Sequence, residues 1–246
     1  MEVHAHTHTP RKKWTHYFWE FLMLFLAVFC GFLAEYQLEH VIEHQREKQF
    51  MKSIVEDIEK DMILIDYEAR LVEQQYKGLD SLCGIIYEGN FNQPAVSKLY
   101  ELQRKFLRPI QMRMINRTEL QLKNAGGMRL IRNREVADSI IKYWSRTEIL
   151  YEQQDNINSH RIKSKDVSFA IFNNKYYQDT EGYYSHGTFN GVPELMTKSN
   201  PLLSEFANRV SHMSNLLEFG YARGLKRQTE NASGLTSLIK REYKIK

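Results

Sequence analysis

The sequence predicts an all-α protein in which an N-terminal transmembrane helix continues into an elongated antiparallel four-helix bundle with a long aromatic loop at its tip. Three observations support this prediction. An almost uninterrupted apolar run covers residues 17–34, a heptad pattern of apolar residues covers 51–86, and only 5 prolines and 12 glycines punctuate the 246 residues. A chain so poor in turn-forming residues favours long helices. Its length leaves room for one packed domain after the apolar run.

The apolar run reads YFWEFLMLFLAVFCGFLA, and Glu20 is its only charged residue. With its neighbours it approaches the roughly 20 residues that a helix needs to cross about 30 Å of hydrocarbon. Basic and aromatic side chains precede or open the run, as is typical of a membrane interface: Arg11, Lys12, Lys13, Trp14, Tyr17, Phe18 and Trp19. We therefore predict a transmembrane anchor over residues 14–38.

Other classes of protein also carry an apolar run near the N-terminus. A cleaved signal peptide ends in a small-x-small site, whereas this run ends in Leu33-Ala34-Glu35-Tyr36. A lipoprotein has a small residue before its acceptor cysteine, whereas Phe29 precedes Cys30. A buried helix of a soluble core is the third alternative, and the basic and aromatic flank argues against it.

The positions of the basic residues predict the orientation in the membrane. Arg11, Lys12 and Lys13 lie at the boundary of the span, whereas Arg46, Lys48 and Lys52 lie further beyond the other end. Positive residues stay on the cytoplasmic side. We therefore expect residues 1–13 to form a cytoplasmic, histidine-rich basic tail and residues 39–246 to form an extracytoplasmic, periplasmic bundle. Cys83 is the only cysteine after the span, so no internal disulfide is expected.

The first bundle helix is predicted from apolar residues that alternate in steps of four and three over about five heptads. They are Met51, Val55, Ile58, Met62, Ile65, Ala69, Val72, Tyr76, Leu79, Cys83 and Ile86. The stretch 88–92 (EGNFN) should end this helix. Pro94 suits the first turn of the next helix, because its missing N–H is not needed there.

The second helical region should run from 94 to 124, with a kink or a break at Pro109, which removes a backbone hydrogen bond. Asn124-Ala125-Gly126-Gly127 is a stop signal, since glycine adopts the left-handed conformation found at helix ends. The third helix is predicted from Asn133, a plausible N-cap, to about residue 172.

Residues 173–200 are aromatic and glycine-bearing, and we predict a long loop there with room for a short hairpin. The fourth helix should begin at Pro201 and weaken near Gly220, Gly224 and Gly234. Short or moderate connections between four helical regions predict an up-down-up-down bundle. In such a bundle the aromatic loop lies at the far tip, and the basic C-terminus lies near the bilayer.

Two segments carry a resemblance to a known family. The opening MEVHAHTHTPRKKWTHYFWEFLMLFLAVFCGFLAEYQLEH and the later RTELQLKNAGGMRLIRNREVADSIIKY resemble an uncharacterised family of single-span Bacteroidota membrane proteins. The resemblance covers the whole chain, and the family's domain has no assigned function. It implies a bacterial inner-membrane protein with a helical extracytoplasmic domain. It supplies no catalytic residue, substrate or cofactor.

His4, His6 and His8 form a candidate metal site, because alternate imidazoles of an extended tail can bind Zn²⁺, Cu²⁺ or Ni²⁺. A solvated tail, whose protonated histidines add positive charge near anionic headgroups, is the alternative. A second candidate is an anion site formed by a run of basic residues that lies after the first bundle helix. It consists of Arg108, Arg113, Arg117, Arg129 and Arg132. Ion pairing with the acidic first bundle helix is the alternative.

Partner contacts are predicted for the long loop, since tyrosine is favoured at interfaces and long loops are often functional. The candidate residues are Tyr176, Tyr177, Tyr183, Tyr184 and Phe189. Packing over the bundle tip is the alternative. Glu20 is the candidate for contact with a partner helix within the membrane, and an interfacial carboxylate is its alternative.

No nucleophile-elbow, phosphate-loop or metalloprotease motif occurs, so we expect no enzyme activity and no cofactor. The leading hypothesis is a membrane-anchored protein that acts by protein binding, as an accessory or scaffold subunit of a bacterial envelope complex. Its partners would be the lipid bilayer through residues 14–38 and a protein or a second copy. An extracytoplasmic ligand sensor that signals through a partner protein is the alternative. Nucleic acid is excluded by the net charge of only +4 and by the predicted compartment.

Overall fold

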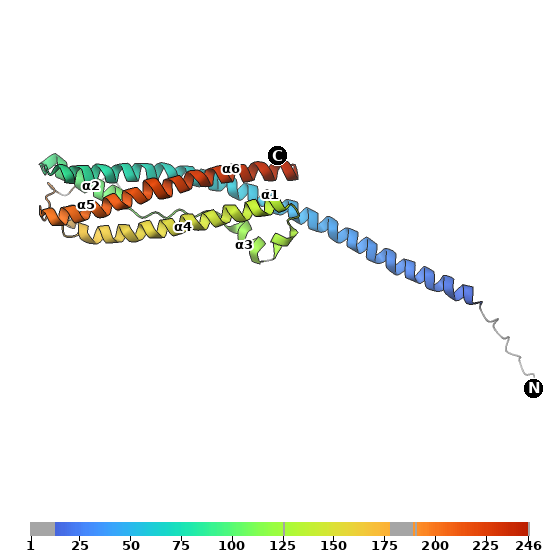
Figure 1. Cartoon of the computed structure of the whole chain (residues 1–246). Coiled ribbons are helices and arrows are strands. Elements are labelled where there is room, and N and C mark those ends of the chain that lie inside the picture. The colour runs from blue at the N-terminus through green and yellow to red at the C-terminus, as the bar shows by residue number, and fades with distance from the viewer. Residues whose placement is uncertain (1–12, 125, 178–188, 190, 246) are drawn as a thin grey trace, which may run out of the picture. The chain divides into compact units, whose positions relative to one another are not determined.

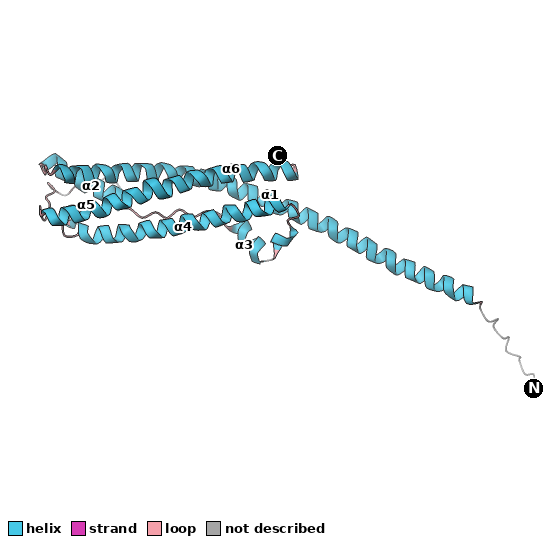
Figure 2. Cartoon of the chain, viewed as in Figure 1, coloured by secondary structure: helices cyan, strands magenta, loops and turns pink. Residues whose placement is uncertain are grey.

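The chain is all-α, as the sequence predicts, and the structure, a computed structural model, describes residues 13–124, 126–177, 189 and 191–245. Among these residues there is no β-strand, and a single isolated bridge joins Phe172 to Leu195 (Figure 2). The chain divides into two compact units, Met1–Gln49 and Phe50–Lys246. The backbone of the first helix is continuous through this division.

Helix α1 (Trp14–Glu88) is 75 residues long. Its N-terminal part contains the apolar run, with a window of mean hydropathy 2.0 that is 0% buried. It is the one helix in the described part of the chain that is long and apolar enough to cross a membrane. This is compatible with a single-pass membrane protein.

The heptad pattern of α1 faces the core of the second unit. Met51, Ile65 and Leu79 are fully buried, and Met62, Ala69 and Tyr76 are partly buried against the same core. The predicted end of the helix is confirmed as well. Helix α1 stops at Glu88, and Gly89 adopts φ +69°, a left-handed conformation that only glycine takes at little cost.

The second helical region is interrupted, as predicted, but by much more than a kink. Helix α2 (Gln93–Phe106) begins at the N-cap Asn92, whose side chain accepts a hydrogen bond from the Ala95 N–H at 3.0 Å. Helix α3 (Arg117–Asn124) follows only after ten non-helical residues, 107–116. We call residues 107–116 the extended segment. The predicted break is therefore confirmed, but the prediction that the rest of residues 107–116 is helical is wrong.

The third and fourth helices are close to their predicted positions. Gly126, at φ +62°, and the short helix η1 (Gly127–Leu130) lead to α4 (Arg134–Ser168), whose N-cap Asn133 accepts from the Val136 N–H. A short helix η2 (Asn174–Tyr177) and a non-helical return precede α5 (Asn200–Asn215). The helix then passes through a π-helical segment, η3 (Leu216–Ala222), into α6 (Arg223–Tyr243). The predicted weakening near Gly220 is thus a change of helix type, and no break occurs at Gly234.

Within the second unit the long helices lie side by side (Figure 1). The Cys83 sulfur in α1 lies 3.4 Å from the Ala207 carbonyl oxygen in α5, and Glu59 pairs with Lys240 in α6 at 2.8 Å. Helix α1 and the continuous helix α5–η3–α6 are therefore antiparallel. Helix α4 also contacts α5 and α6. Helix α2, the extended segment and α3 lie against α1 and α4.

An aromatic cluster closes the α2 end of this unit. Tyr100 lies at its centre, with ring-centroid distances of 5.0 Å to Phe172, 5.2 Å to Tyr177, 5.6 Å to Tyr176 and 5.9 Å to Phe189. The Tyr100 hydroxyl donates to the Glu194 carbonyl at 2.7 Å and accepts from the Asn173 N–H at 2.8 Å. The described part of the loop is thus tied to α2, with the buried Tyr100 at the centre of the contact.

The close approach of α2 to α1 predicts opposite effects of alanine at two glycines of α1. A Cβ at Gly78 would lie 2.2 Å from the ring of the buried Phe106, whereas a Cβ at Gly84 meets no atom within 4 Å. We expect Gly78→Ala to lower the free energy of unfolding by about 1–3 kcal/mol through overpacking. Gly84→Ala should raise it by about 0.5–1 kcal/mol through helix propensity.

Urea unfolding of the full-length protein in detergent, followed by circular dichroism, measures both variants. Equal effects of the two substitutions would contradict the packing of Phe106 against Gly78.

Candidate functional site

The extended segment is the most unusual feature of the second unit, because it lies among helices without a strand partner. Its side chains alternate: Ile110, Met112 and Met114 are buried, whereas Gln111 and Arg113 are exposed. This period of two is that of an extended chain. Buried backbone N–H and C=O groups that find no partner cost free energy, so the neighbouring helices must supply hydrogen bonds from side chains.

Helix α4 supplies these hydrogen bonds along one side of the segment. The Asn158 amide accepts from the Ile110 N–H at 3.0 Å and donates to the Ile110 carbonyl at 2.8 Å. Gln154 donates to the Met112 carbonyl at 3.3 Å, and the Tyr151 hydroxyl accepts from the Met114 N–H at 2.8 Å. An amide side chain here imitates the backbone of a neighbouring β-strand.

Helix α1 supplies hydrogen bonds at the two ends of the segment. The Gln75 amide donates to the carbonyls of Phe106 and Arg108 at 2.8 Å and 3.1 Å. At the other end Asp61 accepts from the Ile115 N–H at 2.8 Å. Asp57 then accepts from both the N–H and the hydroxyl of Thr118, at 3.2 Å and 2.5 Å, which fixes the start of α3.

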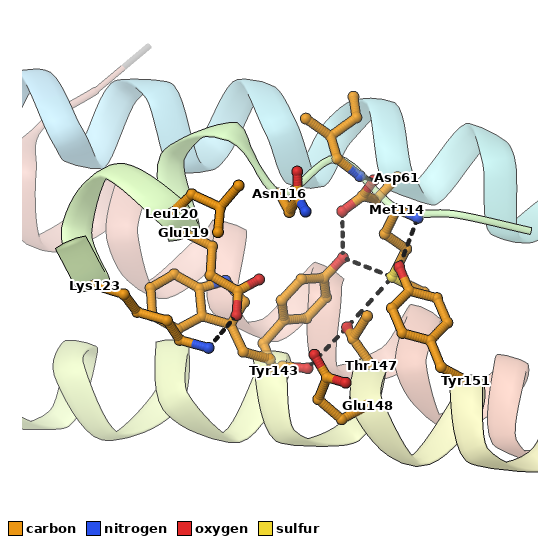
Figure 3. A pocket seen from close by; sticks show the side chains of 12 residues that line it. Asp61, Met114, Asn116, Glu119, Leu120, Lys123, Tyr143, Thr147, Glu148 and Tyr151 are labelled. Carbon is orange, nitrogen blue, oxygen red and sulfur yellow. Dashed lines mark hydrogen bonds and ion pairs between the residues drawn. The ribbon is translucent and has the colours of Figure 1, made fainter.

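Asp61 is the centre of a buried polar cluster (Figure 3). One carboxylate oxygen accepts from Ile115, and the other accepts from the Tyr143 hydroxyl at 2.9 Å. Burial is the largest cause that raises the pKa of Asp61, to about 6, while these two hydrogen bonds oppose the shift. The Met114 sulfur lies 3.3 Å from the Thr147 hydroxyl on the same wall.

A small cavity of about 160 Å³ lies beside this cluster, between α3 and α4. A buried carboxyl with a shifted pKa in a cavity is a candidate for acid–base chemistry. Both oxygens of Asp61, however, already accept hydrogen bonds from the protein. The arrangement therefore positions the extended segment, and we assign Asp61 a structural role.

A larger groove of about 460 Å³ lies between α1 and the extended segment. Its apolar lining includes Leu64, Tyr67 and Leu71 from α1, and Met112 from the segment. Tyr67 is 57% exposed, and the adjacent Ile63 is 72% exposed. The polar lining consists of Glu68, Gln75, Arg108, Gln111 and Arg113. The groove thus combines an apolar floor with charged groups, as a binding site for a peptide or a small molecule does.

Two of the predicted anion-binding arginines meet at this groove. Arg108 donates to the Leu71 carbonyl at 3.3 Å, and the Arg113 guanidinium lies 4.9 Å from the ring centroid of Tyr151. Burial raises the pKa of the nearby Glu68, and the charge of Arg108 opposes this shift. Each of the two guanidinium groups is therefore oriented by the protein at the edge of an apolar surface.

The other predicted arginines do not join them. Arg117 forms an ion pair with Asp57 of α1 at 2.8 Å, which agrees with the alternative of ion pairing for this residue. Arg129 is exposed in η1, and Arg132 already takes part in another interaction. Of the five arginines, only Arg108 and Arg113 line the groove, and an anion site formed by all five stays a prediction.

The remaining predicted site residues either contact neighbouring side chains of the same chain or lie outside the described residues. Tyr176 is buried, and the Tyr177 hydroxyl donates to the Gln103 side chain at 2.6 Å. With Phe189 they pack around Tyr100, so partner binding by this loop stays a prediction. Glu20 pairs with His16 at 3.0 Å. The other candidates, His4, His6, His8, Tyr183 and Tyr184, lie outside the described residues.

Among the described residues no group of three or more histidine, cysteine, aspartate or glutamate side chains is placed to hold a metal ion. Cys83 is buried, and burial raises the pKa of its thiol to about 12. Since the thiolate is the reactive form, this cysteine belongs to the core.

The polar residues that hold the extended segment were missed by the sequence-based prediction, although a signal for them exists. A second row of α1 repeats every seven residues beside the apolar pattern: Ile54, Asp61, Glu68, Gln75 and Leu82. Glu68 is half-buried and the other four residues are buried. The row is apolar at its two ends and polar in the middle, beside the extended segment. In this chain two of the three polar residues of the row, Asp61 and Gln75, hydrogen-bond to the backbone at the two ends of the extended segment.

The π-helical segment places Tyr221 in the core with its hydroxyl buried and, within the described residues, without a hydrogen-bond partner. Burial raises the pKa of this hydroxyl. π-Helical segments are frequent at functional sites. Because its buried hydroxyl lacks a hydrogen bond to any described residue, Tyr221 lowers the free energy of unfolding. Tyr143 does not carry this cost, since its hydroxyl donates to Asp61.

Comparison of the chain with protein-family models, curated proteins and solved structures gives no significant match. The resemblance to the Bacteroidota membrane family therefore stays a prediction. No residue role can be transferred from another protein, and function has to be argued from the geometry of this chain.

The raised pKa of Asp61 predicts a specific pH dependence of stability. Its folded-state pKa of about 6 lies above the ordinary 3.8, so its contribution is fully present below pH 3.8 and is lost as the pH rises through about 6. Asp61→Asn removes this titration. The free energy of unfolding of the variant, relative to wild type, should therefore rise by about 2–3 kcal/mol between pH 4 and pH 8.

Chemical unfolding of both proteins at a series of pH values measures this difference. A difference that does not change with pH would show that Asp61 is not held in a desolvated site.

Removal of the hydroxyl from two buried tyrosines should have opposite effects. Tyr221→Phe removes an unsatisfied buried hydroxyl and should leave stability unchanged or raise it by about 1 kcal/mol. Tyr143→Phe removes the donor to one oxygen of the Asp61 carboxylate, while the Ile115 N–H still serves the other, and should cost about 1–3 kcal/mol near neutral pH. Thermal unfolding compares the two variants, and a larger loss for Tyr221→Phe would contradict the hydrogen bonding described here.

Proposed function

We propose that this chain is a membrane-anchored helical-bundle protein that acts by protein binding rather than catalysis, as an accessory or scaffold subunit of a bacterial envelope complex. Two features of α1 support the proposal. Its N-terminal part exposes large apolar side chains along the whole predicted span, including Trp19, Phe25 and Phe32. Its C-terminal part supplies the central row of the packed core. One helix thus serves as both anchor and core.

The proposed location is the bacterial inner membrane, with residues 1–13 cytoplasmic, 14–38 in the bilayer and 39–246 in the periplasm. The basic residues at the N-terminal edge of the span support this orientation. We interpret the second unit as a four-helix bundle in which the extended segment replaces part of one helix. In this interpretation the loop 173–200 lies at the tip.

The groove beside the extended segment is the observation that carries the proposal of protein binding. Large apolar side chains rarely cluster on a surface without a partner, yet Ile63, Leu64 and Tyr67 are exposed together on α1. Tyrosine and arginine are the residue types enriched where binding energy concentrates at interfaces. Tyr67, Arg108 and Arg113 meet at this groove.

A ligand-sensing domain is the second candidate, and the two arginines at the groove favour it. A small carboxylate or phosphate compound could bind Arg108 and Arg113, and the signal would pass to a partner protein. Reproducible thermal stabilisation of the full-length protein by one class of small anions would support this candidate. Equal melting temperatures with and without such compounds would count against it.

The membrane anchor is tested by fractionation. We expect the untagged full-length protein to sediment with membranes, to stay there at high salt, and to be released by detergent. The double variant Leu24→Arg/Val28→Arg should shift most of the protein to the soluble or degraded fraction, because arginine at the centre of a span costs about 2.5–3.5 kcal/mol. Leu24→Ile/Val28→Ile is the matched control.

Wild-type protein that appears in the aqueous fraction without detergent would overturn the anchor. Protein binding is tested separately, by crosslinking in intact cells and isolation from gently solubilised membranes. A reproducible stoichiometric partner, or a defined homo-oligomer, is expected, and a lone monomer in every preparation would refute the binding function.

A further inference from the structure

The backbone of the extended segment presents one hydrogen-bonding edge to α4. From Ile110 to Ile115 the chain is extended, and the N–H and C=O groups of successive residues point to alternate sides. Ile110, Met112 and Met114 all use α4, through Asn158, Gln154 and Tyr151. The groups of Gln111 and Arg113 therefore point the other way, the side on which Ile115 reaches Asp61 of α1.

On that side the backbone of Gln111 and Arg113 has no hydrogen-bond partner among the described residues. The side chains of α1 across the groove are Leu64, Tyr67, Glu68 and Leu71, and within the described residues none of them is hydrogen-bonded to this edge. Gln75 serves the carbonyls of Phe106 and Arg108 instead. The free edge of the segment thus opens into the groove of about 460 Å³ described above.

The charge beside this edge is positive. Arg108 and Arg113 line the groove, and among the described residues that line it Glu68 is the only acidic one. The Arg108 guanidinium is held by the Leu71 carbonyl, and the Arg113 guanidinium by the Tyr151 ring. Charge complementarity therefore favours an occupant that carries a carboxylate close to its apolar side chains.

We propose that the groove binds an extended acidic peptide segment of a partner protein, which pairs as a β-strand with the free edge at Gln111 and Arg113. This inference rests on the proposed protein-binding function and names the surface and the partner chemistry. Main-chain hydrogen bonds to the edge give affinity, as in other cases of strand addition. Alternate apolar side chains of the peptide enter the groove between Leu64, Tyr67 and Met112. An aspartate, a glutamate or a terminal carboxylate meets the two arginines.

The probe is a displayed library of random peptides, selected on the full-length protein in lipid nanodiscs. The Tyr67→Ala variant serves for counter-selection. Enriched peptides should alternate apolar residues and carry an acidic residue at one end. On binding, amide hydrogen exchange should slow at Gln111 and Arg113, whose N–H groups gain acceptors. It should change little at Ile110 and Met114, whose N–H groups already have acceptors.

Matched variants separate the groove from the rest of the surface. Tyr67→Ala and Arg113→Glu should each weaken peptide binding by about tenfold or more. Tyr87→Ala is the control for the first, because Tyr87 lies on the same helix, is 61% exposed and lies outside the groove. Arg134→Glu is the control for the second, since Arg134 is exposed at the start of α4. Both controls should bind as wild type does.

Several results would overturn the proposal. They are the absence of peptides that prefer wild type to Tyr67→Ala, unchanged binding in Arg113→Glu, or binding without slower exchange at Gln111 and Arg113. Protection of the same residues by inorganic phosphate or succinate alone would assign the arginines to a small anion. Self-association that is lost in Tyr67→Ala would assign the groove to a second copy of the chain.

The test also separates this inference from the proposed function. A cellular partner that still co-isolates with the Tyr67→Ala and Arg113→Glu variants would refute the groove as its site and leave the binding function intact. If selected peptides bind the groove but no partner is isolated from cells, the groove is supported as a peptide site and the proposed cellular binding function is refuted.

Discussion

An extended chain inside a helical bundle must find hydrogen bonds that no helix backbone can offer. Residues 107–116 meet this constraint through side chains. Asn158 imitates a strand partner, and Gln75 and Asp61 serve the two ends. A buried peptide group left without a partner costs about 1–3 kcal/mol, so the identity of each side chain matters. The position of α3, the burial of Asp61 and the groove beside α1 all follow from this arrangement.

The same constraint links the core to the candidate function. The bundle satisfies the extended segment on the α4 side and leaves its other edge beside apolar residues of α1. A surface that combines free backbone groups, exposed tyrosine and arginine is suited to a peptide. On the proposed topology the groove lies on the same continuous helix as the membrane anchor, so a protein bound there would be held at the membrane.

The long helices and their ends follow from the sequence, whereas the extended segment does not. The heptads of α1, its end before Gly89 and the Asn133 cap depend on local signals that the chain carries at those positions. The stretch Ile110-Gln111-Met112-Arg113-Met114 alternates with a period of two, but it is short and lies between helical patterns. Whether it forms a helix or an extended segment depends on Asn158 and Asp61, which are distant in sequence. The positions of the arginine side chains also depend on residues distant in sequence. Arg117 pairs with Asp57, whereas Arg108 and Arg113 are held at the groove by Leu71 and Tyr151.

Residue-resolved amide hydrogen exchange of the free full-length protein measures directly which backbone groups of residues 107–116 are hydrogen-bonded. We expect slow exchange at Ile110, Met114 and Ile115, whose N–H groups donate to Asn158, Tyr151 and Asp61. We expect fast exchange at Gln111 and Arg113 between them. Uniform protection across residues 107–116, as a helix would give, or uniform rapid exchange would contradict this arrangement.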